Sequence, residues 1–185
     1  MSPLAFGILV TGWLAWVAPF FLIKKNKKNK GAPQQLDRRA RWGIALQGVA
    51  FALVWQGRFW TRSPEGWRIP LSILFFALAG ALSWTSARTL GQQWRFDAGL
   101  NPDHELVQSG AYRFVRHPIY ASMIAVMLGT GFLIAQLPLL PFALALHLVG
   151  TEIRVRIEDA LLAARFGDRF REYQGRVPAY ISFVR

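Results

Sequence analysis

One short stretch of the chain combines residue types that can bind a small charged molecule. Residues 110–120 read Gly-Ala-Tyr-Arg-Phe-Val-Arg-His-Pro-Ile-Tyr and lie between two strongly apolar regions. Gly110 can adopt a positive φ and let backbone amides approach a ligand. Pro118 suits the first turn of a helix, which places His117 just outside the helix N-terminus. Unpaired N–H groups and the helix dipole there favour an anion such as a carboxylate.

Arg113 and Arg116 in the same stretch could add positive charge to such an anion site. The stretch also suits a plain membrane anchor, in which the arginines lie on lipid headgroups and the tyrosines lie in the interface. His117 would then serve only as a helix cap. The residues by themselves leave both interpretations open.

A second charged group follows the last long apolar block. Residues 154–159 read Arg-Val-Arg-Ile-Glu-Asp, and the apolar residues after them keep helical spacing. The helix is therefore expected to continue out of the membrane, with Arg154 and Glu158 four residues apart on one face, like Glu152 and Arg156. These could be ordinary helix ion pairs. Alternatively, Arg154 at membrane depth binds an acidic substrate group, and Glu158 binds a cationic or hydroxyl-rich cofactor.

The composition predicts an all-α integral membrane protein. Hydrophobic residues make up 53% of the chain, although its net charge is +12. In a soluble domain this charge would suggest nucleic-acid binding. Here the apolar residues form long blocks with the basic residues between them, so membrane lipids and not nucleic acid are the expected partner. The absence of cysteine excludes disulfides, metal–thiolate sites and a cysteine nucleophile, and no metal site is expected.

About five transmembrane helices are expected to position these groups. The apolar blocks cover residues 4–23, 42–59, 69–85, 119–135 and 139–153. Basic residues follow the first block and none precede it, so it is expected to be a retained span and not a cleaved signal peptide. The connector at 24–41 and the C-terminal tail are the most basic segments, which places both in the cytoplasm and the N-terminus outside. His147, inside the fifth block, is expected to hydrogen-bond a neighbouring helix.

The last half of the chain resembles the isoprenylcysteine carboxyl methyltransferase family. The matching residues are Leu106-Val107, Ser109-Gly110-Ala111-Tyr112 and Arg116-His117-Pro118-Ile119-Tyr120, with Leu90-Gly91-Gln92-Gln93-Trp94 upstream and Arg154, Glu158-Asp159, Leu162, Phe166-Gly167, Tyr173 and Val177-Pro178 downstream. They follow one another in the family's order and spacing. Residues 88–185 are therefore expected to form the catalytic region, with a cytoplasmic loop, two helices and a helical tail. Residues 1–87 hold the first three helices.

The resemblance implies S-adenosylmethionine as the cofactor, bound on the cytoplasmic side, and a lipophilic or lipidated substrate that enters from the membrane. By position, the residues that line the cofactor would be His104, Glu105, Leu106, Val107, Tyr112, His117, Pro118, Ile119 and Tyr120. Glu158 would hold the cofactor and Arg154 the acceptor, so these two are the expected catalytic residues. Asp159 stands where the family usually has a second Glu, and an upstream cofactor contact falls near Asp97.

The chemistry of the acceptor decides which residues must move a proton. Methyl transfer from a sulfonium depends mainly on alignment and exclusion of water. A carboxylate is already a nucleophile at neutral pH, and Arg154 would position it by a charge-assisted pair. An amine, as in phospholipid headgroup methylation, must lose a proton, and Glu158 or His117 would be the base.

Two other interpretations remain: a sterol-type membrane reductase with a nicotinamide cofactor, and a non-catalytic membrane scaffold or transporter. The expected location is the bacterial inner membrane or the endoplasmic reticulum, with the active site facing the cytoplasm. The residues leave the acceptor, the oligomeric state and the host membrane open.

Overall fold

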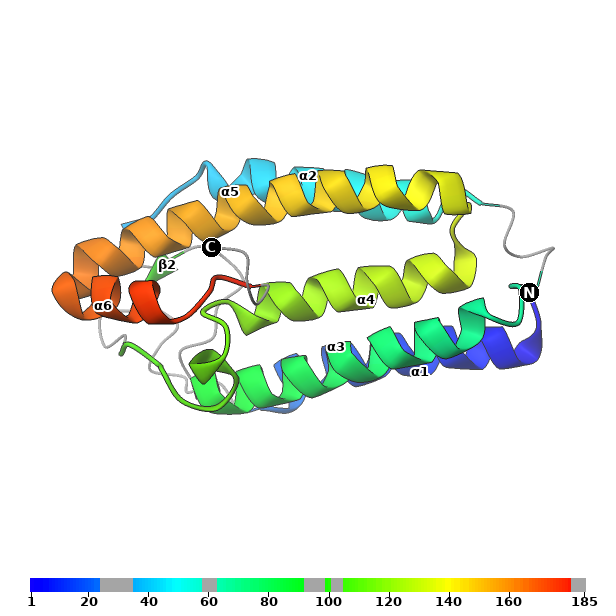
Figure 1. Ribbon diagram of the computed structural model, residues 1–185, viewed down its shortest axis with the longest axis horizontal. Helices are drawn as coiled ribbons and strands as arrows, with labels where there is room; N and C mark the ends of the chain where they lie inside the picture. The colour runs from blue at the N-terminus through cyan, green and yellow to red at the C-terminus, as the bar shows by residue number, and fades with distance from the viewer. Residues whose placement is uncertain (24–34, 58–62, 92–98, 101–104, 181–185) are drawn as a thin grey trace.

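The computed structural model is an elongated bundle of helices (Figure 1). It describes residues 1–23, 35–57, 63–91, 99–100 and 105–180. The helices are α1 (Pro3–Leu22), α2 (Ala40–Val54), α3 (Arg68–Leu90), α4 (Pro118–Ile134), α5 (Leu140–Phe166) and α6 (Asp168–Arg176). Two short 3-10 turns, η3 (Gly110–Arg113) and η4 (Leu137–Leu139), precede α4 and α5. Two-residue strands β1 (Gln35–Leu36) and β2 (Gly99–Leu100) pair in antiparallel fashion.

The helices have the length and surface of membrane helices. α1, α3 and the stretch Leu137–Phe166 are long and apolar enough to cross a membrane, whereas α2 and α4 are shorter apolar helices. Large apolar side chains cover the outside, including Phe21, Trp42 and Phe142, which are 81%, 72% and 70% exposed. Soluble proteins rarely expose so many. An all-α membrane protein is thus confirmed, whereas five crossings with the N-terminus outside remain a prediction.

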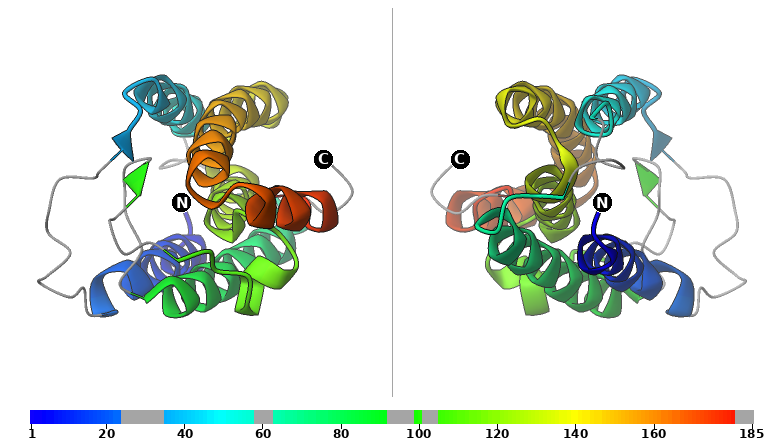
Figure 2. Two further views of the ribbon diagram at one scale, coloured as in Figure 1. Left: turned by 90° about the vertical axis from the view of Figure 1, so that its left-hand side faces the viewer. Right: turned by 90° about the vertical axis from the view of Figure 1, so that its right-hand side faces the viewer.

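Successive long helices alternate in direction along the bundle. The C-terminal ends of α1, α3 and α5 therefore lie at the same end as the N-terminal ends of α2 and α4, and α6 lies there too (Figure 1). α2 packs against α5, and α3 packs against α1 and α4 (Figure 2). The loop before α4, the exit of α5 and the C-terminal tail consequently share one end of the molecule, while η4 lies at the other.

Polar contacts fix the register of the apolar helices. The Trp16 indole of α1 donates to the hydroxyl of Ser122 in α4 (3.0 Å). At the far end, the guanidinium of Arg68 donates to the carbonyls of Phe132 (2.6 Å) and Ala135 (2.6 Å), where α4 ends. The carbonyls of a helix's last turn lack intrahelical partners, and a cation there also suits the helix dipole. Arg68 therefore caps α4 at the end of the bundle opposite the charged loop.

Two helix ends differ from the sequence prediction. The second apolar block was expected to be helical to residue 59, but α2 ends at Val54, where the amide of Gln56 bonds the carbonyl of Leu53 in a tighter turn. α3 continues past residue 85 to Leu90. The additional turn of α3 reaches the loop that precedes α4 and packs against η3 in that loop.

Candidate active site

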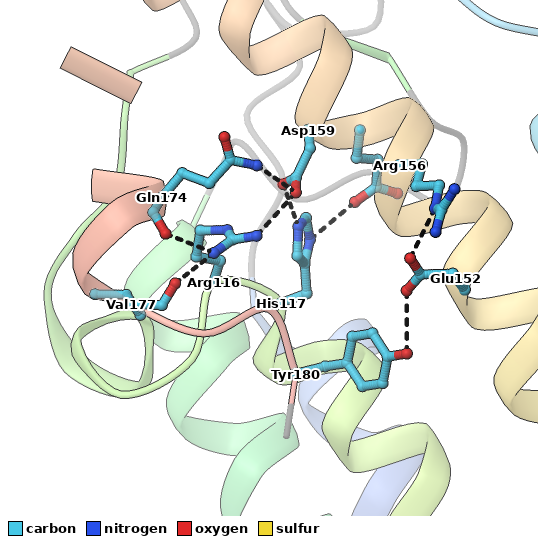
Figure 3. Close-up of polar contacts among 9 residues, drawn as sticks. Arg116, His117, Glu152, Arg156, Asp159, Gln174, Val177 and Tyr180 are labelled. Atoms are coloured by element: carbon cyan, nitrogen blue, oxygen red, sulfur yellow. Dashed lines mark hydrogen bonds and ion pairs between the residues drawn. The ribbon is translucent and has the colours of Figure 1, made fainter. Parts of the chain in front are cut away.

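His117 lies where the loop before α4 meets the end of α5. Pro118 is the first residue of α4, as predicted, so His117 is the N-cap. Its Nε2 is 2.8 Å from Asp159 Oδ1 (Figure 3). Its Nδ1 is 3.4 Å from Glu158 Oε2. Burial lowers the pKa of His117, but the hydrogen bonds and negative charges of Asp159 and Glu158 outweigh it and raise the pKa to about 9. The imidazole is therefore a cation at neutral pH.

Arg116 binds the C-terminal tail. Its side chain is 2% exposed, and its Nη2 lies 2.9 Å from Asp159 Oδ2. Its Nη1 donates to the backbone carbonyls of Gln174 (3.1 Å) and Val177 (Figure 3). The expectation that Arg116 adds charge to an open anion site therefore does not hold. A buried Asp and the tail carbonyls accept hydrogen bonds from both terminal nitrogens of Arg116, while its Nε has no partner among the described residues. The guanidinium carbon of Arg113 lies 5.4 Å from the centre of the Phe114 ring.

The tail also bonds the backbone of the loop. The amide of Arg116 donates to the carbonyl of Pro178 (2.8 Å), and the amide of His117 donates to the carbonyl of Ala179 (2.7 Å). Ala179 is buried and packs with Tyr120. The backbone amide of His117, which was predicted to be available to an anion, thus donates to the carbonyl of Ala179 instead. We call residues 177–180 together with these bonds the tail latch.

A surface ion pair reinforces the tail latch from α5. Arg156 Nε lies 2.7 Å from Glu152 Oε1, which confirms the predicted pairing of these two residues. The hydroxyl of Tyr180 donates to the other oxygen of Glu152 (3.2 Å; Figure 3). The latch therefore reaches from the loop before α4 across to the exposed face of α5.

Arg154 and Glu158 both contact Tyr120, Arg154 at the ring and Glu158 at the hydroxyl. The Tyr120 hydroxyl donates to Glu158 Oε1, and the Arg154 guanidinium carbon is 4.9 Å from the centre of the Tyr120 ring. This is a cation–π distance. Arg154 is 7% exposed, whereas the Glu158 side chain is 25% exposed. Glu158 is therefore the more accessible group, and Arg154 lies deeper between the helices.

The other residues predicted to line a cofactor differ in how far they are buried. Leu106 and Val107 are partly buried and Glu105 is exposed. Tyr112 is buried, which raises the pKa of its phenol well above the usual value, and its carbonyl accepts the Tyr173 hydroxyl. His104 and Asp97 lie outside the described residues.

Gly110 has the positive φ predicted for it, 59°. A Cβ at this position would lie 2.4 Å from Thr89 Oγ1, on the last turn of α3. Only glycine allows the loop to pass this close to α3 in that conformation. The loop before α4 is thereby held against the end of α3.

His147 does not join the cluster. It is fully buried in α5, and its ring meets that of Phe51 in an edge-to-face arrangement with 5.6 Å between the ring centres. Its ring nitrogens have no hydrogen-bond partner among the described residues. The expected bond to a neighbouring helix is therefore not found there. No group of three or more His, Asp or Glu residues in the described parts of the chain is placed to hold a metal ion.

Two residues of the site were missed by the sequence analysis. Asp159 was noted only as a departure from the family pattern, yet it joins Arg116, His117 and the amide of Gln174 (3.1 Å). Gln47 of α2 lies next to Arg154 at 3.5 Å. A buried amide inside an apolar block is the signal that could have identified Gln47, because membrane helices seldom bury polar groups without a partner.

Comparisons with known proteins find similarity to one family of methyltransferases. A family model described as "Isoprenylcysteine carboxyl methyltransferase (ICMT) family" matches residues 72–164. A protein of Schizosaccharomyces pombe named Protein-S-isoprenylcysteine O-methyltransferase is 27% identical over 205 residues, covering 97% of this chain and 86% of the relative. A protein of the same name from Tribolium castaneum is 27% identical over 64% of this chain and 43% of its own length.

A third relative carries a different name. The Cobalt-zinc-cadmium resistance protein CzcN of Cupriavidus metallidurans is 30% identical over 142 residues, which cover 75% of this chain and 61% of the relative. The segment matched by the family model contains the loop before α4, all of α4 and most of α5.

Proposed function

The chain belongs to the isoprenylcysteine carboxyl methyltransferase family, and from this membership we propose that it uses S-adenosylmethionine to methylate a lipophilic carboxylate acceptor at the membrane–cytosol boundary. Membership makes it a membrane methyltransferase. The observation that carries the finer proposal is the position of Arg154 and Glu158 on two sides of Tyr120, at the end of the bundle where the loop and the tail latch meet. One residue can serve the acceptor and the other the cofactor.

Glu158 is the residue proposed to hold the cofactor. Its oxygens lie near the Tyr120 hydroxyl and His117 Nδ1, and a quarter of its side chain is exposed. An accessible carboxylate suits a ligand that carries hydroxyl groups and positive charge, because it accepts hydrogen bonds and attracts cations. These features fit S-adenosylmethionine, which supplies an electrophilic methyl group when bound. The predicted lining residues around His117 and Tyr112 would shape the rest of the pocket.

Arg154 is the residue proposed to bind the acceptor. It projects from α5 into the space between the helices, and it is almost fully buried. Away from water, a guanidinium binds a carboxylate more strongly than it would at the surface, and the planar fork can orient both oxygens. A carboxylate needs no base at neutral pH, so the protein has only to align it and exclude water.

The protonation of His117 favours a carboxylate over an amine acceptor. With a pKa of about 9, the ring is mostly protonated at neutral pH and is therefore a poor acceptor for the proton that an amine must lose. Of the two bases considered for an amine, only Glu158 remains, and that residue is proposed to hold the cofactor. Phospholipid amine methylation is therefore the second candidate, to be decided by the product of the reaction.

Transfer of a tritiated methyl group from S-adenosylmethionine tests the proposal. The purified protein is given either N-acetyl-S-farnesylcysteine, which carries a carboxylate, or vesicles of phosphatidylethanolamine, which carry an amine. We expect a methyl ester, recognised because base releases its label, on the first substrate only. A base-stable label on the lipid would establish the amine alternative. Calorimetric binding of NADPH in place of S-adenosylhomocysteine would favour a reductase.

A pair of arginine variants tests the assigned roles. Arg154→Ala should abolish turnover while the affinity for S-adenosylhomocysteine stays nearly unchanged. Arg169→Ala is the matched control, because Arg169 is an exposed arginine of α6. Equal loss of turnover and cofactor affinity in Arg154→Ala would refute the assignment of Arg154 to the acceptor.

A further inference from the structure

We infer that α2 takes part in the site through Gln47, a positioning residue that orients the Arg154 guanidinium for the acceptor. The inference rests on the proposed function, since it takes Arg154 as the acceptor-binding group. α2 lies outside the segment matched by the family model, which begins at residue 72.

A chain of buried polar contacts connects α2 to Arg154. Gln47 is 3% exposed, and its Nε2 donates to Thr151 Oγ1 at 2.9 Å. Its Oε1 faces Arg154 Nη1 at 3.5 Å, which is long for a hydrogen bond. Arginine can only donate, so the amide must present its oxygen to Arg154 and its nitrogen to Thr151. The hydroxyl of Thr151 can donate or accept, so Arg154 decides the orientation of the amide and the bond to Thr151 holds the amide in place.

Gly43, one turn before Gln47, provides the space for the Arg154 stem. A Cβ on Gly43 would lie 2.5 Å from Arg154 Cγ and 2.5 Å from the carbonyl oxygen of Gly150. A Cβ on Gly150 would in turn lie 2.6 Å from the carbonyl oxygen of Gly43. The backbones of α2 and α5 therefore touch here, as small residues permit in membrane bundles. The aliphatic part of Arg154 passes directly over α2.

The guanidinium is consequently held between two helices that are not its own. The ring of Tyr120 in α4 lies on one side, at 4.9 Å, and the amide of Gln47 in α2 lies beside Nη1. The guanidinium has five donors in a planar fork, and Gln47 faces one nitrogen. Because Gln47 is neutral, it orients the fork without cancelling the charge that a carboxylate acceptor needs.

Two glutamine variants of α2 test the positioning role. Gln47→Leu keeps the approximate size of the side chain but removes its hydrogen bonds. Gln56→Leu is the matched control, because Gln56 lies exposed just after the other end of α2. We expect Gln47→Leu to raise the acceptor KM about tenfold, as for the loss of a hydrogen bond to a charged group. The affinity for S-adenosylhomocysteine should stay within about twofold of the unchanged protein.

The outcome separates positioning from a general structural role. An unchanged acceptor KM in Gln47→Leu would overturn the inference, and so would a parallel loss of cofactor affinity. Gln47→Glu adds a test of charge: the new carboxylate would pair with Arg154 and compete with an anionic acceptor, so the acceptor KM should rise further than in Gln47→Leu. An acceptor KM equal to that of the unchanged protein would refute the charge argument.

A stability measurement tests the contact between Gln47 and Arg154 independently of the proposed function. The shifts in Tm are measured for Gln47→Leu, Arg154→Met and the double variant. If Gln47 and Arg154 interact, each single change loses the same contact, so the shift of the double variant is smaller than the two single shifts added together. Additive shifts would overturn the contact. Should the unchanged protein methylate no acceptor, the proposed function fails and the Tm shifts alone decide on Gln47.

Discussion

Replacing Asp159 by Asn should lower the pKa of His117 by removing the nearer of two negative charges. In the folded protein, Asp159 Oδ1 lies 2.8 Å from His117 Nε2, and Oδ2 lies 2.9 Å from Arg116 Nη2. Asn has nearly the same shape and can still accept a hydrogen bond, so the packing is retained while the charge is lost. Burial lowers the pKa of His117, and of the two carboxylates that raise it only Glu158 is then left.

The magnitude follows from the difference between the folded and unfolded states. His117 has a pKa of about 9 when folded and an ordinary value of 6.5. At about 1.4 kcal/mol per pH unit, this difference corresponds to about 3 kcal/mol of stability. Because the folded pKa is raised, the contribution is complete below pH 6.5 and is lost as the pH rises through 9. The Asp159→Asn protein should show a weaker decline of stability over this window.

Nuclear magnetic resonance of 13C-labelled histidine measures the pKa directly. The chain has three histidines, and the His117 signal is assigned by its absence from a His117→Gln variant. Titration in detergent should give a midpoint of about 9 for the unchanged protein and at least about one unit lower for Asp159→Asn. A midpoint near 6.5 before the substitution, or the same midpoint in both proteins, would refute the reasoning.

Three further substitutions separate the functions of the bundle's two ends. Arg116→Met removes one of the two cations that pair with the buried Asp159 and releases the tail latch, so thermal unfolding should show a loss of about 1.5–3 kcal/mol, as for hydrogen bonds to a charged group; an unchanged Tm would contradict this. Tyr120→Phe removes the hydroxyl that donates to Glu158 but keeps the ring beside Arg154. Calorimetry should therefore show an affinity for the cofactor that is reduced about fivefold, while the acceptor KM stays unchanged. A raised acceptor KM with unchanged cofactor affinity would contradict the roles assigned to Glu158 and Arg154. Arg68→Met removes the cap of α4, so the free energy of unfolding should fall by about 1–3 kcal/mol and Tm should fall with it. The acceptor KM should stay the same, and a selective rise in that KM would contradict the separation of the two ends of the bundle.

The helices could be predicted from the sequence because each apolar block must satisfy its own backbone hydrogen bonds in lipid. The blocks at 4–23 and 119–135 correspond to α1 (3–22) and α4 (118–134) within a residue. The ends of α2 and α3 were predicted less well. They depend on single turn bonds, such as the one from the Gln56 amide, and hydropathy does not register these.

The candidate site could be predicted only where its geometry is local. The shared helix face of Arg154 and Glu158 follows from a spacing of four residues, and the position of Pro118 follows from the preferences of proline. The partners of Arg116 and Gln47 could not be predicted from such local spacing, because Arg116 and Asp159 are separated by 43 positions in the sequence, and Gln47 and Arg154 by 107. No local pattern shows that a loop arginine binds the tail or that an amide of α2 faces α5.

The most direct test of the central claim is an experimental structure of the protein with S-adenosylhomocysteine and a farnesylated cysteine bound together. The claim is that one pocket beside Tyr120 serves both ligands. We expect the nucleoside within hydrogen-bonding distance of Glu158 and the carboxylate of the acceptor on the guanidinium of Arg154. Ligands bound away from Tyr120, or a carboxylate held by other residues, would contradict it.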